Sequence, residues 1–165
     1  MVERFLGEHD IIVSKTDTKG IIQYGNDVFC KIADYSVGEI LQKPHKLLRH
    51  PDMPSCIFKL LWNAIQSGNE IFAYVKNLTK NGDFYWVFAH VTPSFNESGD
   101  IVGYHSSRRH PTEKALNVIK PLYAELLRIE KQARSKNESI EKSLKYLEDI
   151  LAQKGVTYEE FIFSL

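Results

Sequence analysis

Pro44-His45-Lys46-Leu47-Leu48-Arg49-His50-Pro51-Asp52-Met53-Pro54 connects two apolar helical patterns, and the rest of the chain is arranged on either side of it. Because proline fixes φ and has no backbone N–H, this stretch cannot form the interior of a regular helix. It brings Arg49, His50 and Asp52 close together on a stiffened chain. In isolation such a stretch would be a surface loop with a local Arg–Asp ion pair, so its surroundings decide its function.

Two β-branched runs precede this stretch, at residues 11–16 and 21–24, with a turn between them. This pattern predicts a β-hairpin. A short helix is predicted at residues 28–33, where Asn26 or the following aspartate is suited to cap its start. Ser36 is expected to cap a second short helix.

After the stretch, residues 54–66 have the apolar spacing of an amphipathic helix, and the proline at the start suits its first turn. Asn81-Gly82 is a strong hairpin signal between two extended runs. Three strands are therefore predicted at residues 70–79, 84–95 and 101–109. Together with the opening hairpin they indicate an α+β domain built on an antiparallel sheet.

Beyond Pro111 the composition changes to Glu, Lys, Leu, Ala and Ile, and apolar residues recur with heptad spacing. This spacing predicts two amphipathic helices. Pro121 should either kink the first helix or split off its opening turn. Asn137 or Ser139 is expected to cap the second, and Thr157 begins a capping-box pattern for a terminal turn. The heptad positions are Ala115, Ile119, Leu122, Leu126, Ile129 and Ala133, then Ile140, Leu144, Leu147 and Leu151.

Three regions are expected: a lead-in over residues 1–9 with one amphipathic turn, the α+β domain over 10–110, and a helical region over 111–165. The last region has three open roles. It would mediate dimerisation or pairing with a partner, fold back on the sheet as a helical hairpin, or simply complete the packing.

The composition excludes several classes of function. Lys and Arg together number 21, as do Asp and Glu, so no net charge favours nucleic acid or an anionic membrane. The two cysteines have no metal-ligand spacing and are expected to be inert buried thiols. No signal peptide and no apolar run of about 20 residues is present, which predicts a soluble cytoplasmic protein. A Rossmann fingerprint and a paired acid and base at catalytic spacing are both missing, so no enzyme is predicted.

Motifs along residues 10–110 resemble those of PAS domains, and more narrowly the flavin-binding PAS of the Aer-type aerotaxis and energy-taxis family. This resemblance implies a five-stranded antiparallel sheet with short helices on one face, followed here by a C-terminal α-helical tail. The motifs that carry it, in order, are Tyr24-Gly25-Asn26-Asp27-Val28-Phe29, Pro44-His45, Arg49-His50-Pro51-Asp52-Met53-Pro54, Val75-Lys76-Asn77, Lys80-Asn81-Gly82-Asp83-Phe84-Tyr85-Trp86-Val87 and Val102-Gly103-Tyr104.

The resemblance also implies that FAD is held between the sheet and the helical connections. Five polar residues correspond by motif position to FAD-binding residues of the family, and two aromatic residues are candidates to wall the ring. The predicted cofactor-binding residues are Asn26, Arg49, His50, Asp52, Trp62, Phe72 and Asn77. The chain departs from the family pattern at Phe72, often Trp in relatives, at His90, which replaces an Asn, and at Asp34, which replaces a Gly.

The residues themselves leave alternatives open. Asn26 either caps a helix alone or also contacts the ring. Trp62 either packs in the core or walls the cofactor. Arg49 and Asp52 either bind each other or bind FAD. His50 is a candidate to titrate between redox states, because the ordinary pKa of histidine is about 6.5.

The sequence thus predicts a non-enzymatic FAD redox sensor that signals energy or oxygen status to a membrane-bound chemoreceptor-like partner through its HAMP or linker region. No catalytic residues, no metal site, no nucleic acid and no direct membrane insertion are expected. The partner would hold it at the inner face of the membrane, and a homodimer through the PAS domain or the tail is a further expectation. The alternatives are a haem or small-ligand PAS sensor, and a cofactor-free dimerisation or scaffold module.

Overall fold

The computed structural model describes all 165 residues, and they form two compact units. The first unit consists of residues 1–51 and 64–111, and the second of residues 52–63 and 112–165. Helix α3 (Ser55–Gln66) therefore begins in the second unit and ends in the first.

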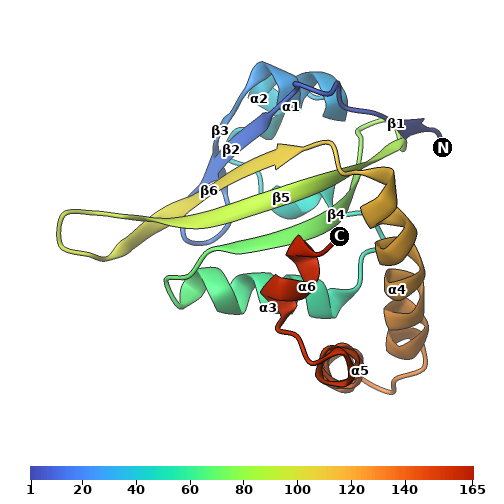
Figure 1. Ribbon diagram of the computed structural model, residues 1–165. Helices are drawn as coiled ribbons and strands as arrows, with labels where there is room; N and C mark the ends of the chain where they lie inside the picture. Colours follow the sequence, from blue (N-terminus) through green and yellow to red (C-terminus); the bar gives the residue numbers. More distant parts are fainter. The chain divides into compact units, whose positions relative to one another are not determined.

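A mostly antiparallel sheet forms the centre of the first unit (Figure 1). β5 pairs with β4 and β6, β6 also pairs with β2, and β2 pairs with β3, which confirms the five expected strands. The lead-in adds a sixth, β1, which runs parallel to β5, so the amphipathic turn predicted there was wrong. The strands are β1 (Glu3–Arg4), β2 (Ile12–Thr16), β3 (Ile22–Gly25), β4 (Ile71–Leu78), β5 (Phe84–Phe95) and β6 (Ile101–Arg109).

Side-chain alternation gives the sheet two different faces. The β4–β5 register places Asn77 opposite Tyr85, and β6 places Arg108 opposite Ala89 of β5 and Ile12 of β2. Tyr85 and Ala89 are an even number of residues apart on one strand, so these side chains share one face, which we call the inner face. Residues in odd register with them lie on the opposite, outer face.

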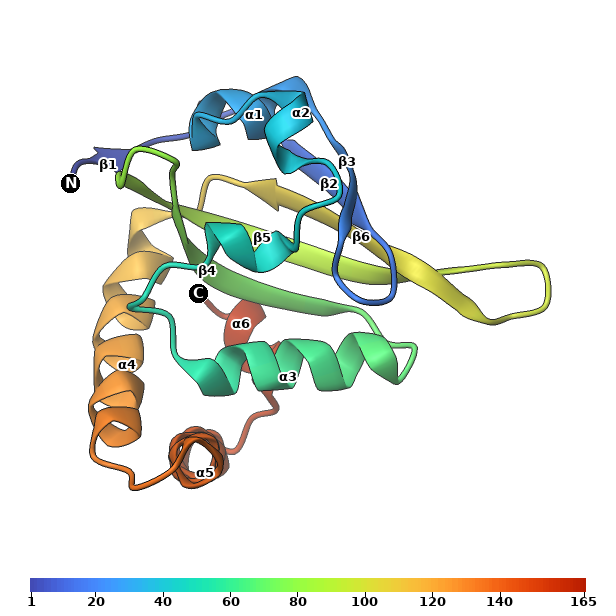
Figure 2. The same cartoon turned by 180° about the vertical axis from the view of Figure 1, so that it is seen from behind.

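Short helices cover the inner face, as Figure 2 shows for α1 and α2. The Phe29 ring of α1 lies beneath the guanidinium of Arg108, at 5.2 Å from its Cζ, and meets the His45 ring edge-on at 6.1 Å. Asn26 caps α1, and Ser36 caps α2 in a capping box, as predicted. The covering elements are α1 (Asp27–Ala33), α2 (Val37–Ile40) and the 3₁₀ turn η1 (His45–Leu48).

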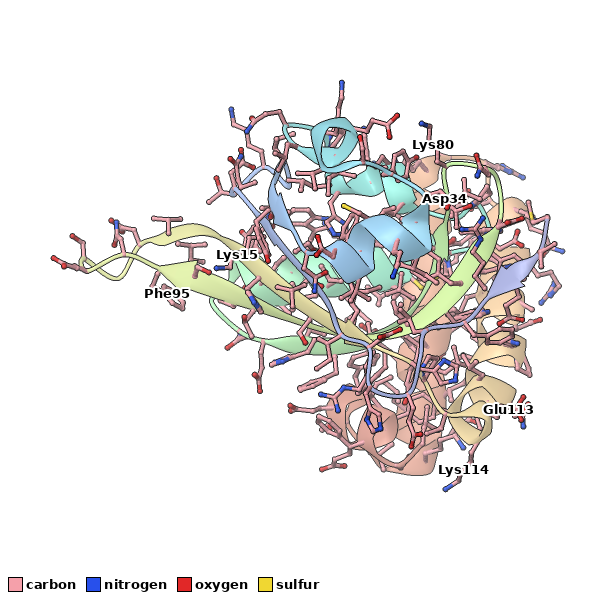
Figure 3. All side chains as sticks on the ribbon, turned by 90° about the horizontal axis from the view of Figure 1, so that it is seen from above. Lys15, Asp34, Lys80, Phe95, Glu113 and Lys114 are labelled. Carbon is pink, nitrogen blue, oxygen red and sulfur yellow. The ribbon has the colours of Figure 1, made fainter.

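An ion-pair cluster holds β1 against the end of α1. Arg4 pairs with Asp34 and with Asp83, and its Nη2 lies 2.9 Å from the Asp83 carboxylate. Asp34 ends α1 in the left-handed conformation, at φ 61°, and the Arg4 hydrogen bond lowers its pKa. Asn81 of the β4–β5 turn donates to Asp34 at 2.7 Å, and Figure 3 shows Asp34 and Lys80 at the same end of the unit. This cluster consists of long-range ion pairs and hydrogen bonds, which the periodicity of the sequence alone does not predict.

The β5–β6 hairpin projects beyond the other strands (Figure 1). Phe95 near its tip is 52% exposed. At its base, Gly103 packs so closely on β2 that a Cβ there would lie 2.3 Å from the Thr16 carbonyl oxygen. Only glycine permits this approach of the two backbones.

The second unit combines the first part of α3 with the C-terminal helices. The predicted amphipathic helices are present, and α4 packs against α5. Apolar side chains of both are buried, including Ile119 and Leu126 of α4 and Leu147 of α5. The remaining elements are α4 (Glu113–Lys131), α5 (Lys136–Lys154) and α6 (Tyr158–Phe163), and none of the helices is long and apolar enough to cross a membrane.

Two details of the tail differ from expectation. α4 runs through Pro121 as one helix, so of the two predicted outcomes the splitting of its opening turn is wrong. α5 begins earlier than predicted, because Ser135 rather than Asn137 or Ser139 accepts the capping hydrogen bond. The capping box that begins at Thr157 is present and starts α6.

Candidate cofactor-binding site

A buried arginine occupies the centre of the inner face. Arg108 is 3% exposed. Its Nη2 donates to Ser14 Oγ at 2.7 Å, and its Nη1 lies 3.3 Å from His45 Nε2. With the Phe29 ring on one side of the guanidinium, β2, α1 and η1 all contribute to its surroundings.

The positive charge of Arg108 has no carboxylate partner. Its neighbours are a hydroxyl, an imidazole and an aromatic ring, and its Nε has no hydrogen-bond partner. Burial lowers the pKa of Arg108 to about 10, while the Tyr85 phenol acts in the opposite direction. A buried charge that is unpaired destabilises a fold by several kcal/mol, on the order expected for ion desolvation. A bound anion, or a bound group rich in hydrogen-bond acceptors, would offset this free-energy cost of burying Arg108.

Two more polar groups on the inner face are buried without hydrogen-bond partners. These are Nδ2 of Asn77 and Oη of Tyr85, which face each other across the β4–β5 ladder. Asn77 is 4% exposed and Tyr85 1% exposed. Burial raises the pKa of Tyr85 to about 12, so its hydroxyl keeps its proton at neutral pH and remains a donor. The inner face thus presents amide, hydroxyl and guanidinium donors together.

His45 completes this polar cluster in an uncharged form. Burial and, to a smaller extent, the nearby Arg108 charge lower its pKa to about 3. Its Nε2 lies 3.1 Å from Ser14 Oγ. A neutral imidazole leaves an acceptor nitrogen available to Arg108.

His45 predicts a specific pH dependence of stability. In the unfolded chain its pKa returns to about 6.5, so above that pH the imidazole is neutral in both states. As the pH falls from about 6.5 towards 3, only the unfolded chain gains the proton, and the free energy of unfolding falls by up to about 1.4 kcal/mol per pH unit. We expect urea unfolding of His45→Gln to show a flatter decline than wild type between about pH 6.5 and 5.

The exposed His9 gives the matched control, because His9→Gln should leave the decline unchanged. The pKa of His105 is also lowered, and His105 contributes equally to the pH dependence of unfolding in wild type, His45→Gln and His9→Gln. Parallel curves for wild type and His45→Gln would contradict the assignment to His45.

Arg49 and His50 of the proline-rich stretch lie beside β4 and the start of β5 respectively. The backbone of Arg49 forms a β-bridge with Asn77, and its side chain is exposed. His50 is 3% exposed, with its ring 5.9 Å from that of Phe84 in an edge-on contact. The bridge thus places Arg49 beside Asn77, with His50 next along the chain, and FAD contact by these residues stays a prediction.

Asn26 has a fully structural set of contacts. Its Oδ1 accepts from the backbone N–H groups of Phe29 and Val13, and its Nδ2 donates to the Ile11 carbonyl at 2.9 Å. Of the two alternatives for this residue, these contacts describe the helix cap, and they also tie α1 to the start of β2. Ring contact by Asn26 stays a prediction.

The three other predicted residues lie in the second unit or on the outer face. Asp52 and Trp62 belong to the second unit, and Phe72 lies on the outer face, in odd register with Asn77. Phe72 stacks on His90 with ring centroids 4.1 Å apart. Phe72 and Asn77 therefore lie on opposite faces of β4, because side chains alternate between faces along a strand, and cofactor contact by Phe72 stays a prediction.

Sequence reasoning did not select Arg108, Ser14 or Tyr85. The available signal was an arginine at an inward position of the last strand, but two arginines occur side by side there, at 108 and 109. Only the register of the folded sheet distinguishes the inward residue from the outward one.

The comparisons agree with this fold. A family model described as the PAS fold matches residues 22–108. The aerotaxis receptor of Escherichia coli (strain K12) is 37% identical over 121 residues, which are 73% of this chain and 24% of the receptor. The chain thus spans about a quarter of the length of this relative.

Solved structures show the same fold at lower identity. The light state of the blue-light photoreceptor Aureochrome1 LOV has 23% identity and a TM-score of 0.60, covering 67% of this chain and 88% of that one. A structure described as "Flavin Analogue Sheds Light on Light-Oxygen-Voltage Domain Mechanism" has 17% identity and a TM-score of 0.58, covering 70% and 86%. The chain therefore belongs to the PAS family, and within it resembles the aerotaxis-receptor type.

Proposed function

We propose that this protein is a cytoplasmic FAD-binding PAS redox sensor that signals energy or oxygen status to a membrane-bound chemoreceptor-like partner. The similarity to an aerotaxis receptor supports the signalling role, and the likeness in fold to a light-oxygen-voltage domain studied with a flavin analogue supports a flavin. The whole receptor is about four times as long as the matched segment, so the similarity supports the sensor part of the role.

The observation that carries the proposal is the set of unpartnered donors on the inner face. Asn77 Nδ2, Tyr85 Oη and Arg108 Nε are all buried without hydrogen-bond partners. Buried polar groups in native proteins are nearly always paired, so three on one sheet face favour a ligand that supplies acceptors. A flavin offers ring carbonyls and nitrogens, and FAD adds a diphosphate, so the donor set fits this cofactor.

The residues of the site have separate roles in this proposal. FAD supplies reversible one- and two-electron chemistry when bound. Arg108 would stabilise negative charge on the inner face, and Asn77 is able to reverse its amide to donate or accept. Neutral His45 and Ser14 hold the guanidinium in place. Arg49, His50 and Asp52 would contact the cofactor from the proline-rich stretch, with Trp62 as a candidate wall.

The absorption spectrum of the purified protein tests this function. We expect the two visible bands of an oxidised flavin, bleaching on reduction, and FAD as the chromophore that heat releases. Protein purified without cofactor should acquire the same spectrum when FAD is added. Sustained oxidation of an electron donor is not expected from a sensor.

Other spectra would point to the alternatives. A single intense Soret band would indicate haem, and the histidines would then be the candidate axial ligands. A protein that remains colourless with added FAD and added haem would instead be a dimerisation or scaffold module, and the FAD site would be rejected.

A further inference from the structure

A carboxylate of the C-terminal region binds the first turn of α3. Glu130 of α4 accepts from the backbone N–H of Ser55 at 2.9 Å through Oε2, and from that of Cys56 at 3.0 Å through Oε1. Oε1 also accepts from Ser143 Oγ of α5 at 3.1 Å. All four residues lie in the second unit. We call this arrangement the Glu130 clasp.

The clasp caps the start of α3 from a distant part of the chain. The first N–H groups of a helix have no partner within it, and a residue just before the helix usually satisfies one of them. Here the acceptor comes from a residue 75 positions further along the chain. Its negative charge also lies at the positive end of the α3 dipole, where it is favourable. The start of α3 therefore depends on the tail.

The clasp is partly buried, because Glu130 and Ser55 are of intermediate exposure while the other two residues are fully buried. Ser143 and Cys56 are both 0% exposed. Burial is the main cause that raises the pKa of the Cys56 thiol to about 11, so this cysteine stays protonated at neutral pH. Removing the carboxylate would take the acceptor away from two backbone donors, whereas the Ser143 hydroxyl keeps the Ile140 carbonyl as a partner.

The position of the clasp in the chain suggests its role. Ser55 follows the proline-rich stretch directly, three residues after Asp52, and Pro54 limits the freedom of the chain between them. The tail thus holds the downstream end of the segment that carries Arg49, His50 and Asp52. A change at that segment has a short, stiff path to α4 and α5.

We propose that Glu130 is a positioning residue that couples the cofactor-binding stretch to the C-terminal helices. The inference rests on the proposed FAD-binding function. In it, the clasp fixes the end of the proline-rich stretch when the cofactor is in one redox state and loosens in the other. Because such coupling is reciprocal, loosening the clasp by mutation also weakens the binding of FAD.

Hydrogen exchange of the full-length protein tests this, with Glu130→Gln as the variant. Glutamine keeps the size of the side chain but replaces one of the two acceptor oxygens with an NH₂ donor, so the N–H group now bonded to that oxygen loses its acceptor. Glu125→Gln is the matched control, because Glu125 lies on the same helix and pairs with Arg128 at 2.6 Å instead of with α3. Exchange is measured with FAD oxidised and reduced, together with FAD affinity.

For Glu130→Gln we expect the Ser55 and Cys56 amides to exchange about tenfold faster, as for a lost helix cap. FAD affinity should fall at least about fivefold, the low end of measured couplings between sites. In wild type and Glu125→Gln, exchange in α5 should differ between the two redox states, and in Glu130→Gln this difference should vanish. A purely structural residue would speed exchange equally in both states.

If Glu130→Gln does not fold, Ser143→Ala removes a single hydrogen bond of the clasp and should move the same measurements in the same direction by less. Unchanged FAD affinity and an unchanged redox difference in a flavin-loaded, folded variant would overturn the coupling alone. A wild-type protein without flavin would overturn the proposed function and the coupling to it, while the α3 amides would still report whether the clasp exists.

Discussion

Replacing Arg108 with Met is expected to weaken FAD binding by about tenfold to a hundredfold while leaving the cofactor-free protein as stable as wild type or more stable. The loss follows because a hydrogen bond to a charged group contributes about 1.5–3 kcal/mol, and each 1.4 kcal/mol is about tenfold in affinity. The stability effect has the opposite sign, because Arg108 is a buried charge with no carboxylate partner. An apolar side chain of similar length removes the desolvation penalty.

The neighbouring residue supplies the control. Arg109 is exposed and in odd register with Arg108, so Arg109→Met should change neither quantity. Titration of the cofactor-free proteins with FAD gives the affinity, and urea unfolding gives the stability. If Arg108→Met kept its affinity and lost several kcal/mol of stability, Arg108 would be a structural residue and the anion site on the inner face would be rejected.

Phe29→Ala is expected to lower the free energy of unfolding by about 3–5 kcal/mol, the range for truncating a buried phenylalanine. Phe29 is 0% exposed, and its ring contacts both Arg108 and His45. The cavity would remove the packing of α1 on the inner face and the aromatic support of the guanidinium. FAD affinity should therefore fall as well.

Phe95→Ala is the matched control, since Phe95 is 52% exposed on the projecting β5–β6 hairpin, where Figure 3 labels it. Urea unfolding at neutral pH should show a change within about 0.5 kcal/mol for this variant. A loss below about 1 kcal/mol for Phe29→Ala would mean that α1 does not pack on the sheet as described.

Local signals in the sequence were reliable for the elements of the first unit. The β-branched runs, the Asn-Gly turn and the caps at Asn26 and Ser36 are all present. Gly82 has the positive φ that its turn requires, and Asp34 the left-handed conformation expected of a residue replacing glycine. Each of these depends on a few neighbouring residues, so the chain specifies them without reference to distant segments.

The candidate site was predictable only in part, because it depends on strand register as well as on local motifs. The motif brought Arg49, His50 and Asn77 to attention, and the Arg49–Asn77 bridge joins their segments. Asn77 and Phe72 were both predicted to bind the cofactor, although they are five positions apart on one strand and so lie on opposite faces. A residue's face is set by strand register, and register is fixed by pairing with distant strands.

The sequence by itself thus determined the order and type of the elements, the PAS family and the proline-rich stretch, because these follow from local dihedral preference, periodicity and motif spacing. Tertiary structure alone decided that Arg108 rather than Arg109 is buried, that β1 pairs with β5, and that the tail binds the start of α3 through Glu130. These contacts join residues more than 70 positions apart or depend on which side of a sheet a side chain occupies. Such information exists only once the whole chain is packed.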